Sequence, residues 1–91
     1  MNFPSISDYF ILIENNALTC SRIMTMSDCE RAALQLNLID VTVADDRQNG
    51  VYFDPPYCYF EGGSLKFNSA GTNTGPCTST DKCLCYAISC T

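Results

Sequence analysis

The sequence contains no histidine and no tryptophan, and its five Lys+Arg are outnumbered by ten Asp+Glu, for a net charge of −5. Without histidine, a Ser–His or Cys–His catalytic pair, an imidazole zinc ligand and a histidine pH switch are all excluded. An acidic surface repels phosphate backbones, which argues against nucleic-acid binding. The apolar run at residues 9–13 is far too short to span a membrane.

Cysteine is abundant instead, with seven in 91 residues. No C-x-x-C pair occurs, whereas a structural zinc site is typically built from two such pairs. We therefore expect disulfides, with no metal and no cofactor, in one domain that spans residues 1–91. Disulfides indicate an oxidising place: extracellular, in a secretory lumen, or on the surface of a cell or virus particle.

The N-terminus gives no targeting signal of the usual kind. Residues 1–5 include no basic residue, and the apolar run at 9–13 is too short for the core of a signal peptide. Three origins stay open: a mature product, an excised repeat with an added methionine, and a protein that reaches an oxidising compartment without a classical signal.

Residues 8–13 (DYFILI) are dense in aromatic and β-branched side chains and end at the turn signal of residues 14–16. This pattern predicts a strand. Because the run is almost continuously apolar, we expect both faces to be covered, as in a central strand of the domain. The alternative is a strand exchanged with a neighbouring subunit, where it adds to the edge of that subunit's sheet.

Residues 27–30 (SDCE) form a capping-box pattern that predicts a helix over residues 28–37. Cys29, Ala32, Ala33 and Leu36 follow at helical spacing and would share one face of it. The small alanines would let this face lie close to a sheet.

The remaining chain predicts strands and loops. A polar acidic loop covers residues 40–54, and a strand can begin only after Pro55-Pro56, which supplies no ladder donors. Further segments are a hairpin over 57–67 with glycines in its turn, an irregular surface loop over 68–80 held at Cys77, and a strand over 82–88. The expected fold class is a small disulfide-rich α+β domain, with one helix packed on an antiparallel sheet.

The order of these motifs can be written C…EC..AA…L…PP.CY…G.L.FN…C…C.C, over about residues 9–86. It resembles a family of cysteine-rich extracellular modules of algae, other protists and some of their large viruses. The resemblance implies a secreted or surface-displayed module, often repeated, with no known active site to carry over. Six cysteines match the pattern: Cys20, Cys29, Cys58, Cys77, Cys83 and Cys85.

Six cysteines allow 15 pairings, so spacing alone does not fix the connectivity. On this framework we expect the bonds Cys29–Cys58, Cys77–Cys83 and Cys20–Cys85. Cys90 lies outside the pattern. One hypothesis is an intermolecular disulfide that locks subunits together; the alternatives are a free or capped thiol and a local partner.

Two further segments are candidate binding sites. The acidic segment 45–50 (DDRQNG) suggests calcium, but an EF-hand loop that starts at Asp45 would have Arg47 at its third position and Pro56 at its twelfth. A solvated loop is favoured there. The aromatic residues of 52–67 include Tyr57 and Tyr59, which should share one face of a strand; they would contact a glycan if exposed, although such residues more often fill a core.

The sequence gives little indication of glycosylation. No N-x-S/T sequon is present, and the Ser/Thr-rich residues 69–80, especially near Pro76, would allow O-linked sugars.

Three function classes follow. The first is a non-enzymatic structural or interaction module that self-assembles, as a homo-oligomer or filament, into an extracellular fibre, coat or matrix. The second is a carbohydrate-binding, lectin-like module that uses the aromatic hairpin of residues 52–67. The third is a small secreted effector, for which no inhibitory loop is visible. An enzyme is the least expected class, because no acid/base pair is evident at a cleft.

Overall fold

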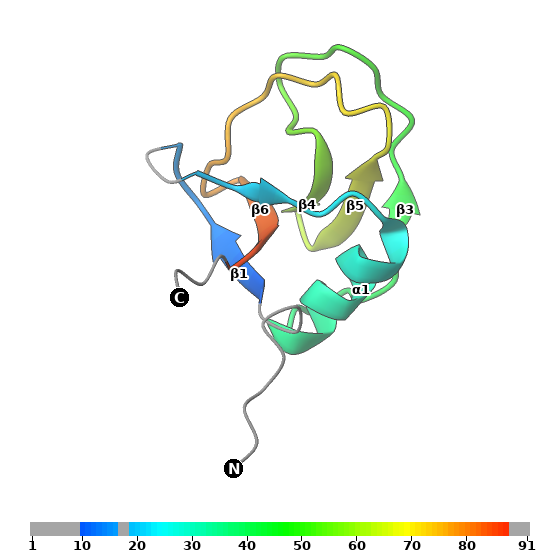
Figure 1. Ribbon diagram of the computed structural model, residues 1–91, viewed down its shortest axis with the longest axis vertical. Coiled ribbons are helices and arrows are strands. Elements are labelled where there is room, and N and C mark those ends of the chain that lie inside the picture. The colour runs from blue at the N-terminus through cyan, green and yellow to red at the C-terminus, as the bar shows by residue number, and fades with distance from the viewer. Residues whose placement is uncertain (1–9, 17–18, 88–91) are drawn as a thin grey trace.

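The computed structural model describes residues 10–16 and 19–87. They contain one helix and a six-stranded sheet, joined by irregular loops (Figure 1). The elements in chain order are β1 (Phe10–Ile13), β2 (Ser21–Arg22), α1 (Met26–Gln35), β3 (Ala44–Asp45), β4 (Tyr57–Glu61), β5 (Ser64–Asn68) and β6 (Asp81–Tyr86). The strand order is β1-β6-β4-β5-β3, and β2 pairs with β6. All pairs are antiparallel except β3 with β5. The predicted α+β class is confirmed, with a sheet that is mixed at one end.

The helix starts earlier and ends earlier than predicted. Its N-cap is Thr25, whose Oγ1 accepts a hydrogen bond from the Asp28 backbone N–H at 3.1 Å. The capping box at Ser27 is therefore wrong, and Glu30 instead accepts from the backbone N–H of Val43 at 2.8 Å. The helix stops because Asn37 adopts a left-handed φ of 56°, and the Leu38 N–H returns to the Ala33 carbonyl in a Schellman motif.

One face of the sheet, which we call the helix face, packs against α1. The predicted helical stripe is buried there, with Cys29, Ala32 and Ala33 fully enclosed. They pack in one cluster with sheet residues that alternate toward them. These residues are Phe10, Cys58, Leu65, Phe67 and Leu84. The helix face is a conventional apolar core.

The opposite face, which we call the loop face, carries the other residues of the same strands. Ile13, Cys83 and Cys85 lie on it in a second cluster, together with Cys77 from the long loop between β5 and β6. Residues 46–56 and 69–80 form two irregular segments that run side by side (Figure 1). Backbone hydrogen bonds link them, from Thr74 N–H to Val51 O and from Gly75 N–H to Asp54 O.

The hairpin over residues 57–67 forms as predicted and extends to Asn68. Gly62 and Gly63 make its two-residue turn with φ values of 59° and 81°, which suit the turn type that matches strand twist. Glu61 and Ser64 close the hairpin as partners. Leu65 and Phe67 are buried on the helix face, while Lys66 lies on the loop face beside Glu61.

The N-terminal strand differs from the prediction. Of residues 8–13, positions 8 and 9 lie outside the described residues, and β1 stands at the end of the sheet rather than in its centre. Because β4 and β2 pair with the other side of β6, β1 is the edge strand at this end of the sheet. Phe10 and Ile13 are buried but Ile11 is 38% exposed. Both faces of β1 are therefore only partly covered.

Candidate functional site

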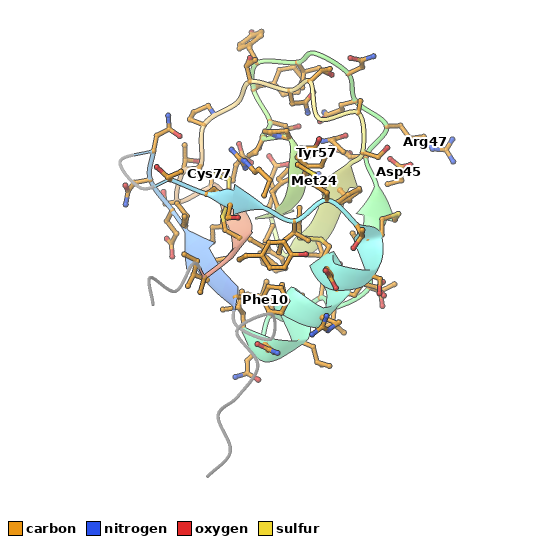
Figure 2. The ribbon with its side chains drawn as sticks, in the orientation of Figure 1. Phe10, Met24, Asp45, Arg47, Tyr57 and Cys77 are labelled. Carbon is orange, nitrogen blue, oxygen red and sulfur yellow. A yellow bond between two sulfur atoms is a disulfide. The ribbon has the colours of Figure 1, made fainter. Side chains whose placement is uncertain are left out.

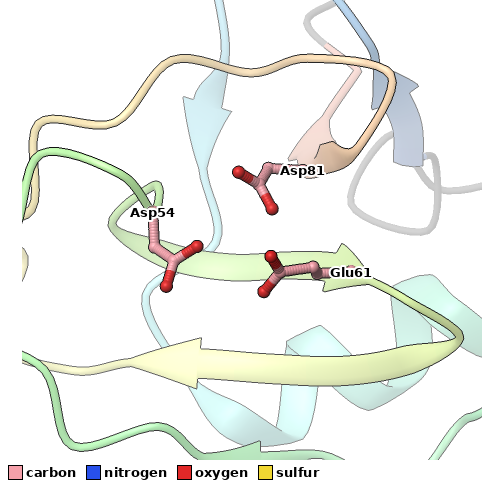
Figure 3. A group of neighbouring side chains, drawn as sticks. All are labelled: Asp54, Glu61 and Asp81. Carbon is pink, nitrogen blue, oxygen red and sulfur yellow. The ribbon is translucent and has the colours of Figure 1, made fainter.

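Three carboxylates meet on the loop face, where β4 and β6 lie next to each other (Figure 3). Glu61 and Asp81 are direct partners in the β4–β6 ladder, and Asp54 approaches from the loop before β4. One oxygen from each side chain lies within 4.8 Å of the others. We call Asp54, Glu61 and Asp81 the acidic cluster. Among the described residues, it is the one group of three carboxylates placed closely enough to hold a metal ion together.

Hydrogen bonds hold Asp54 in place. Its Oδ2 accepts from Gln48 Nε2 at 2.8 Å, and its carbonyl accepts from the Gly75 N–H at 3.0 Å. A side chain at Gly75 would collide with this backbone, because its Cβ would lie 2.4 Å from the carbonyl carbon of Asp54. Asp54 is 5% exposed, so its carboxylate is fixed rather than solvated.

Asp81 is placed by the turn that starts β6. The Thr78 Oγ1 accepts from the Asp81 backbone N–H at 2.9 Å, and the Thr78 N–H donates to the Asp81 carbonyl at 2.9 Å. This turn directs the carboxylate of Asp81 toward Glu61 and Asp54 (Figure 3). Burial, and then the neighbouring carboxylate of Glu61, raise the pKa of Asp81 to about 6.

Lys66 supplies a positive charge beside the cluster. Its Nζ lies 3.1 Å from Glu61 Oε1. Although burial alone would lower it, the pKa of Lys66 is raised because of its hydrogen bond to Glu61. The lysine therefore stays protonated, and three carboxylates with one ammonium leave a negative excess when all are ionised. The oxygen-only set of ligands suits a hard cation or a shared proton.

Tyr59 lies on the same face and is fully buried. Its hydroxyl donates a hydrogen bond to Asp46 Oδ2. Burial, reinforced by Asp46, raises the pKa of Tyr59 well above its usual value. The phenol is thus a neutral structural donor.

Tyr57 and Tyr59 do not form the exposed aromatic face that contact with a glycan would require. Tyr59 is enclosed, and a φ of 62° at Tyr57 breaks the strand alternation, so the two rings do not share a face. The Tyr57 ring packs toward Phe67, with centroids 6.1 Å apart, and Gly71 approaches it so closely that a Cβ there would lie 2.3 Å from the hydroxyl oxygen. Neither tyrosine offers an open stacking surface.

Three disulfides join the six framework cysteines as Cys20–Cys85, Cys29–Cys58 and Cys77–Cys83. These are the three pairs expected from the sequence. Cys29–Cys58 ties α1 to the hairpin on the helix face, and the other two bonds lie on the loop face. Cys83 and Cys85 point to one face and take separate partners. Cys90 lies outside the described residues.

The acidic segment 45–50 does not come together as a cation loop. Asp45 is exposed beside Arg47 at the outer edge of the fold, and its Oδ1 accepts from the Arg47 backbone N–H at 2.9 Å (Figure 2). Asp46 faces inward to Tyr59. Part of the segment forms β3, which was not predicted because two residues give no periodic pattern.

The acidic cluster was not found in the sequence, because its members are 7 and 20 positions apart. Strand alternation could have placed Glu61 on the face of Tyr59, opposite Cys58. Its partner Asp81 follows only from the β4–β6 register, which local patterns do not give. Asp54 precedes Pro55-Pro56 and reads as an ordinary turn residue.

Comparisons with protein-family models, with curated proteins and with solved structures find no match to this chain. The resemblance to the cysteine-rich modules therefore stays a prediction. Among the described residues, no helix is long and apolar enough to cross a membrane. The disulfides fit an oxidising compartment, as expected for an extracellular or secreted protein.

Proposed function

We propose that this protein is a non-enzymatic extracellular module that self-assembles into a surface fibre, coat or matrix. The observation that carries the proposal is the edge strand β1, which ends the sheet and, among the described residues, pairs only with β6. Its sequence, FILI, contains none of the charges or prolines that usually protect an exposed strand edge. Such an edge can pair with the same strand of a second copy.

The opposite edge of the sheet, formed by β3, differs from β1 in length and charge. There, β3 is only two residues long, and the acidic residues Asp45 and Asp46 stand at its end. Short, charged edges resist pairing. The two ends of the sheet are thus unequal, and β1 is the end suited to a neighbour.

A fibre needs a second joint, because β1 pairing with β1 closes a symmetric dimer. Cys90 is the cysteine left over from the three disulfides. Two Cys90 thiols from different dimers would form one disulfide, releasing two protons and two electrons to the oxidising compartment. Alternating β1 and Cys90 joints would extend the chain of subunits without limit.

The test is the mass of the oxidised protein in solution, measured by light scattering during size-exclusion chromatography. We expect species larger than dimers for the unmodified protein, dimers for Ile11→Lys and for Cys90→Ser, and monomers for the double variant. Ile39→Lys is the matched control, because Ile39 is 88% exposed and belongs to no strand of the sheet. An unmodified protein that stays at 10.0 kDa would refute self-assembly.

Carbohydrate binding remains a second candidate, supported by a different pair of aromatics. Tyr52 and Phe53 are 78% and 54% exposed and their rings meet edge to face at 5.5 Å. Exposed aromatic faces can stack on sugars. Retention of the protein on a polysaccharide column, and its loss in Tyr52→Ala, would support this function; equal passage of both proteins without retention would exclude it.

A further inference from the structure

The acidic cluster places like charges where a sheet normally avoids them. Glu61 and Asp81 are directly opposite each other across β4 and β6, an arrangement that destabilises an antiparallel pair. Asp54, which is 5% exposed, adds a third carboxylate. Three carboxylates this close, two of them buried and Glu61 half-buried, repel one another. Something of opposite charge would relieve that repulsion.

A second observation concerns the Asp81 side chain. It is buried, and its Oδ1 is enclosed and receives no hydrogen bond from any described residue. The carboxylate points into the space between Asp54 and Glu61 (Figure 3). A buried acceptor without a donor is costly and uncommon in folded proteins. It marks a place where a ligand atom would complete the bonding.

The protein's own cations do not satisfy the cluster. Lys66 binds one oxygen of Glu61, and its positive charge also acts on Asp81. Gln48 donates to one oxygen of Asp54 but adds no charge. Three carboxylates and one ammonium leave two negative charges, which a divalent cation would neutralise.

We propose that Asp54, Glu61 and Asp81 form a calcium-binding site. Their ligands are all carboxylate oxygens, which suit hard cations, whereas zinc prefers nitrogen and sulfur. Two oxygens that each lie about 2.3–2.6 Å from Ca²⁺ can be up to about 5 Å apart, whereas Mg²⁺, at about 2.0–2.1 Å, draws its ligands to within about 4.2 Å. The three oxygens lie within 4.8 Å of one another, so calcium, whose coordination geometry is flexible, can bind all three, with water filling the remaining positions.

The affinity should be modest. Three carboxylates with a competing lysine resemble the weaker oxygen sites, for which Kd values are on the order of 10⁻⁴–10⁻³ M. That range suits an extracellular module, because calcium outside cells reaches such concentrations. Calcium would then join the β6 start to the β4 end and to the loop that carries Asp54.

The test is a calcium titration of the oxidised full chain at neutral pH after chelator treatment, followed by thermal unfolding and calorimetry. NaCl at matched ionic strength, and MgCl₂, serve as comparison salts. We expect a saturable rise in Tm with CaCl₂ and a smaller one with MgCl₂. Asp81→Asn should weaken calcium binding on the order of tenfold or more. The variant should fold, because it removes a like-charge contact.

Asp45→Asn is the matched control, since it removes one carboxylate from the exposed acidic segment and leaves the cluster intact. Its calcium affinity should equal that of the unmodified protein. Glu61→Gln gives a second, independent loss of affinity. The proposal is overturned if NaCl raises Tm as much as CaCl₂, or if Asp45→Asn and Asp81→Asn lose affinity equally, because diffuse screening of an acidic surface would then explain the effect.

Discussion

The helix face of the sheet is closed by apolar side chains from α1 and the strands, whereas the loop face is closed by two disulfides and by hydrogen bonds between buried polar groups. On the helix face, Ala32 and Ala33 let α1 lie close to Leu84 and Leu65. On the loop face, Asn68 and Asn73 are 1% and 5% exposed and both donate to Gln48 Oε1. The same strands thus support two kinds of interior.

With two kinds of interior, a 91-residue chain extends a small core. A domain of this size buries limited apolar surface, and one helix covers only one side of its sheet. Irregular loops can cover the other side only if their backbone groups are satisfied. Asn73 does this directly, accepting from the Val51 N–H and donating to the Pro55 carbonyl.

The largest expected effect comes from removing disulfides, one face at a time. Cys29–Cys58 closes a sequence separation of 29 and Cys77–Cys83 one of 6. Loop entropy then gives losses of about 3.5 kcal/mol for the Cys29→Ser/Cys58→Ser variant and about 2 kcal/mol for Cys77→Ser/Cys83→Ser. Urea unfolding measures both. If Cys77→Ser/Cys83→Ser lost more unfolding free energy than Cys29→Ser/Cys58→Ser, the Cys77–Cys83 bond would stabilise the loop face by more than loop entropy accounts for.

A smaller effect should follow from Asn73→Ala, which leaves the Val51 N–H and the Pro55 carbonyl without their partner. Unsatisfied buried groups cost about 1–3 kcal/mol, so the free energy of unfolding should fall by this amount. Asn49→Ala is the control, because Asn49 is exposed and water can replace its hydrogen bond from Thr72. Equal losses in the two variants would mean that the polar contacts of the loop face contribute no more than surface contacts.

The smallest effect concerns pH and Asp40, which ties the segment after α1 to β5. Hydrogen bonds from the backbone N–H groups of Leu65 and Thr42 lower the pKa of Asp40 below its ordinary 3.8. The native state therefore favours the charged form of Asp40. The stability that the ionised Asp40 contributes is complete above the pKa that Asp40 has in the unfolded chain, and it is lost as the pH falls through the lower pKa that Asp40 has in the folded protein. Asp40→Asn should flatten the acid limb of the stability curve, which is the fall in the free energy of unfolding as the pH decreases from neutral.

That curve is measured by urea unfolding from neutral pH down to about pH 3. Asp45→Asn removes a charge of the same sign from an exposed position and should keep the acid limb. An acid limb that is unchanged in Asp40→Asn, or lost in Asp45→Asn, would contradict the assignment.

The helix face was largely predictable, because its parts are periodic. The spacing of Cys29, Ala32 and Ala33 identified the buried stripe of α1, and Gly62-Gly63 identified the hairpin. The helix ends were missed by two residues because Thr25 competes with Ser27 as a cap, and because Asn37 can take the left-handed conformation that stops a helix. Such choices depend on neighbouring contacts.

The loop face was not predictable in the same way. Residues 68–80 were expected to be an irregular surface loop; Asn68 instead ends β5, and residues 69–80 are irregular, yet Asn73, Gly75 and Cys77 are buried. Polar and glycine residues indicate a loop but not what it covers. The acidic cluster likewise depends on the β4–β6 register and on the close approach of Gly75 to Asp54. Both are contacts between residues far apart in the sequence, and no local sequence pattern indicates them.

The two ends of the sheet carry the functional proposal, so the most direct measurement is the mass of the native, oxidised protein across a wide concentration range. Light scattering should find species beyond the dimer that grow with concentration and that fall to dimers in Ile11→Lys. A single species of 10.0 kDa at every concentration would contradict the account, because the unprotected edge of β1 would then have no partner.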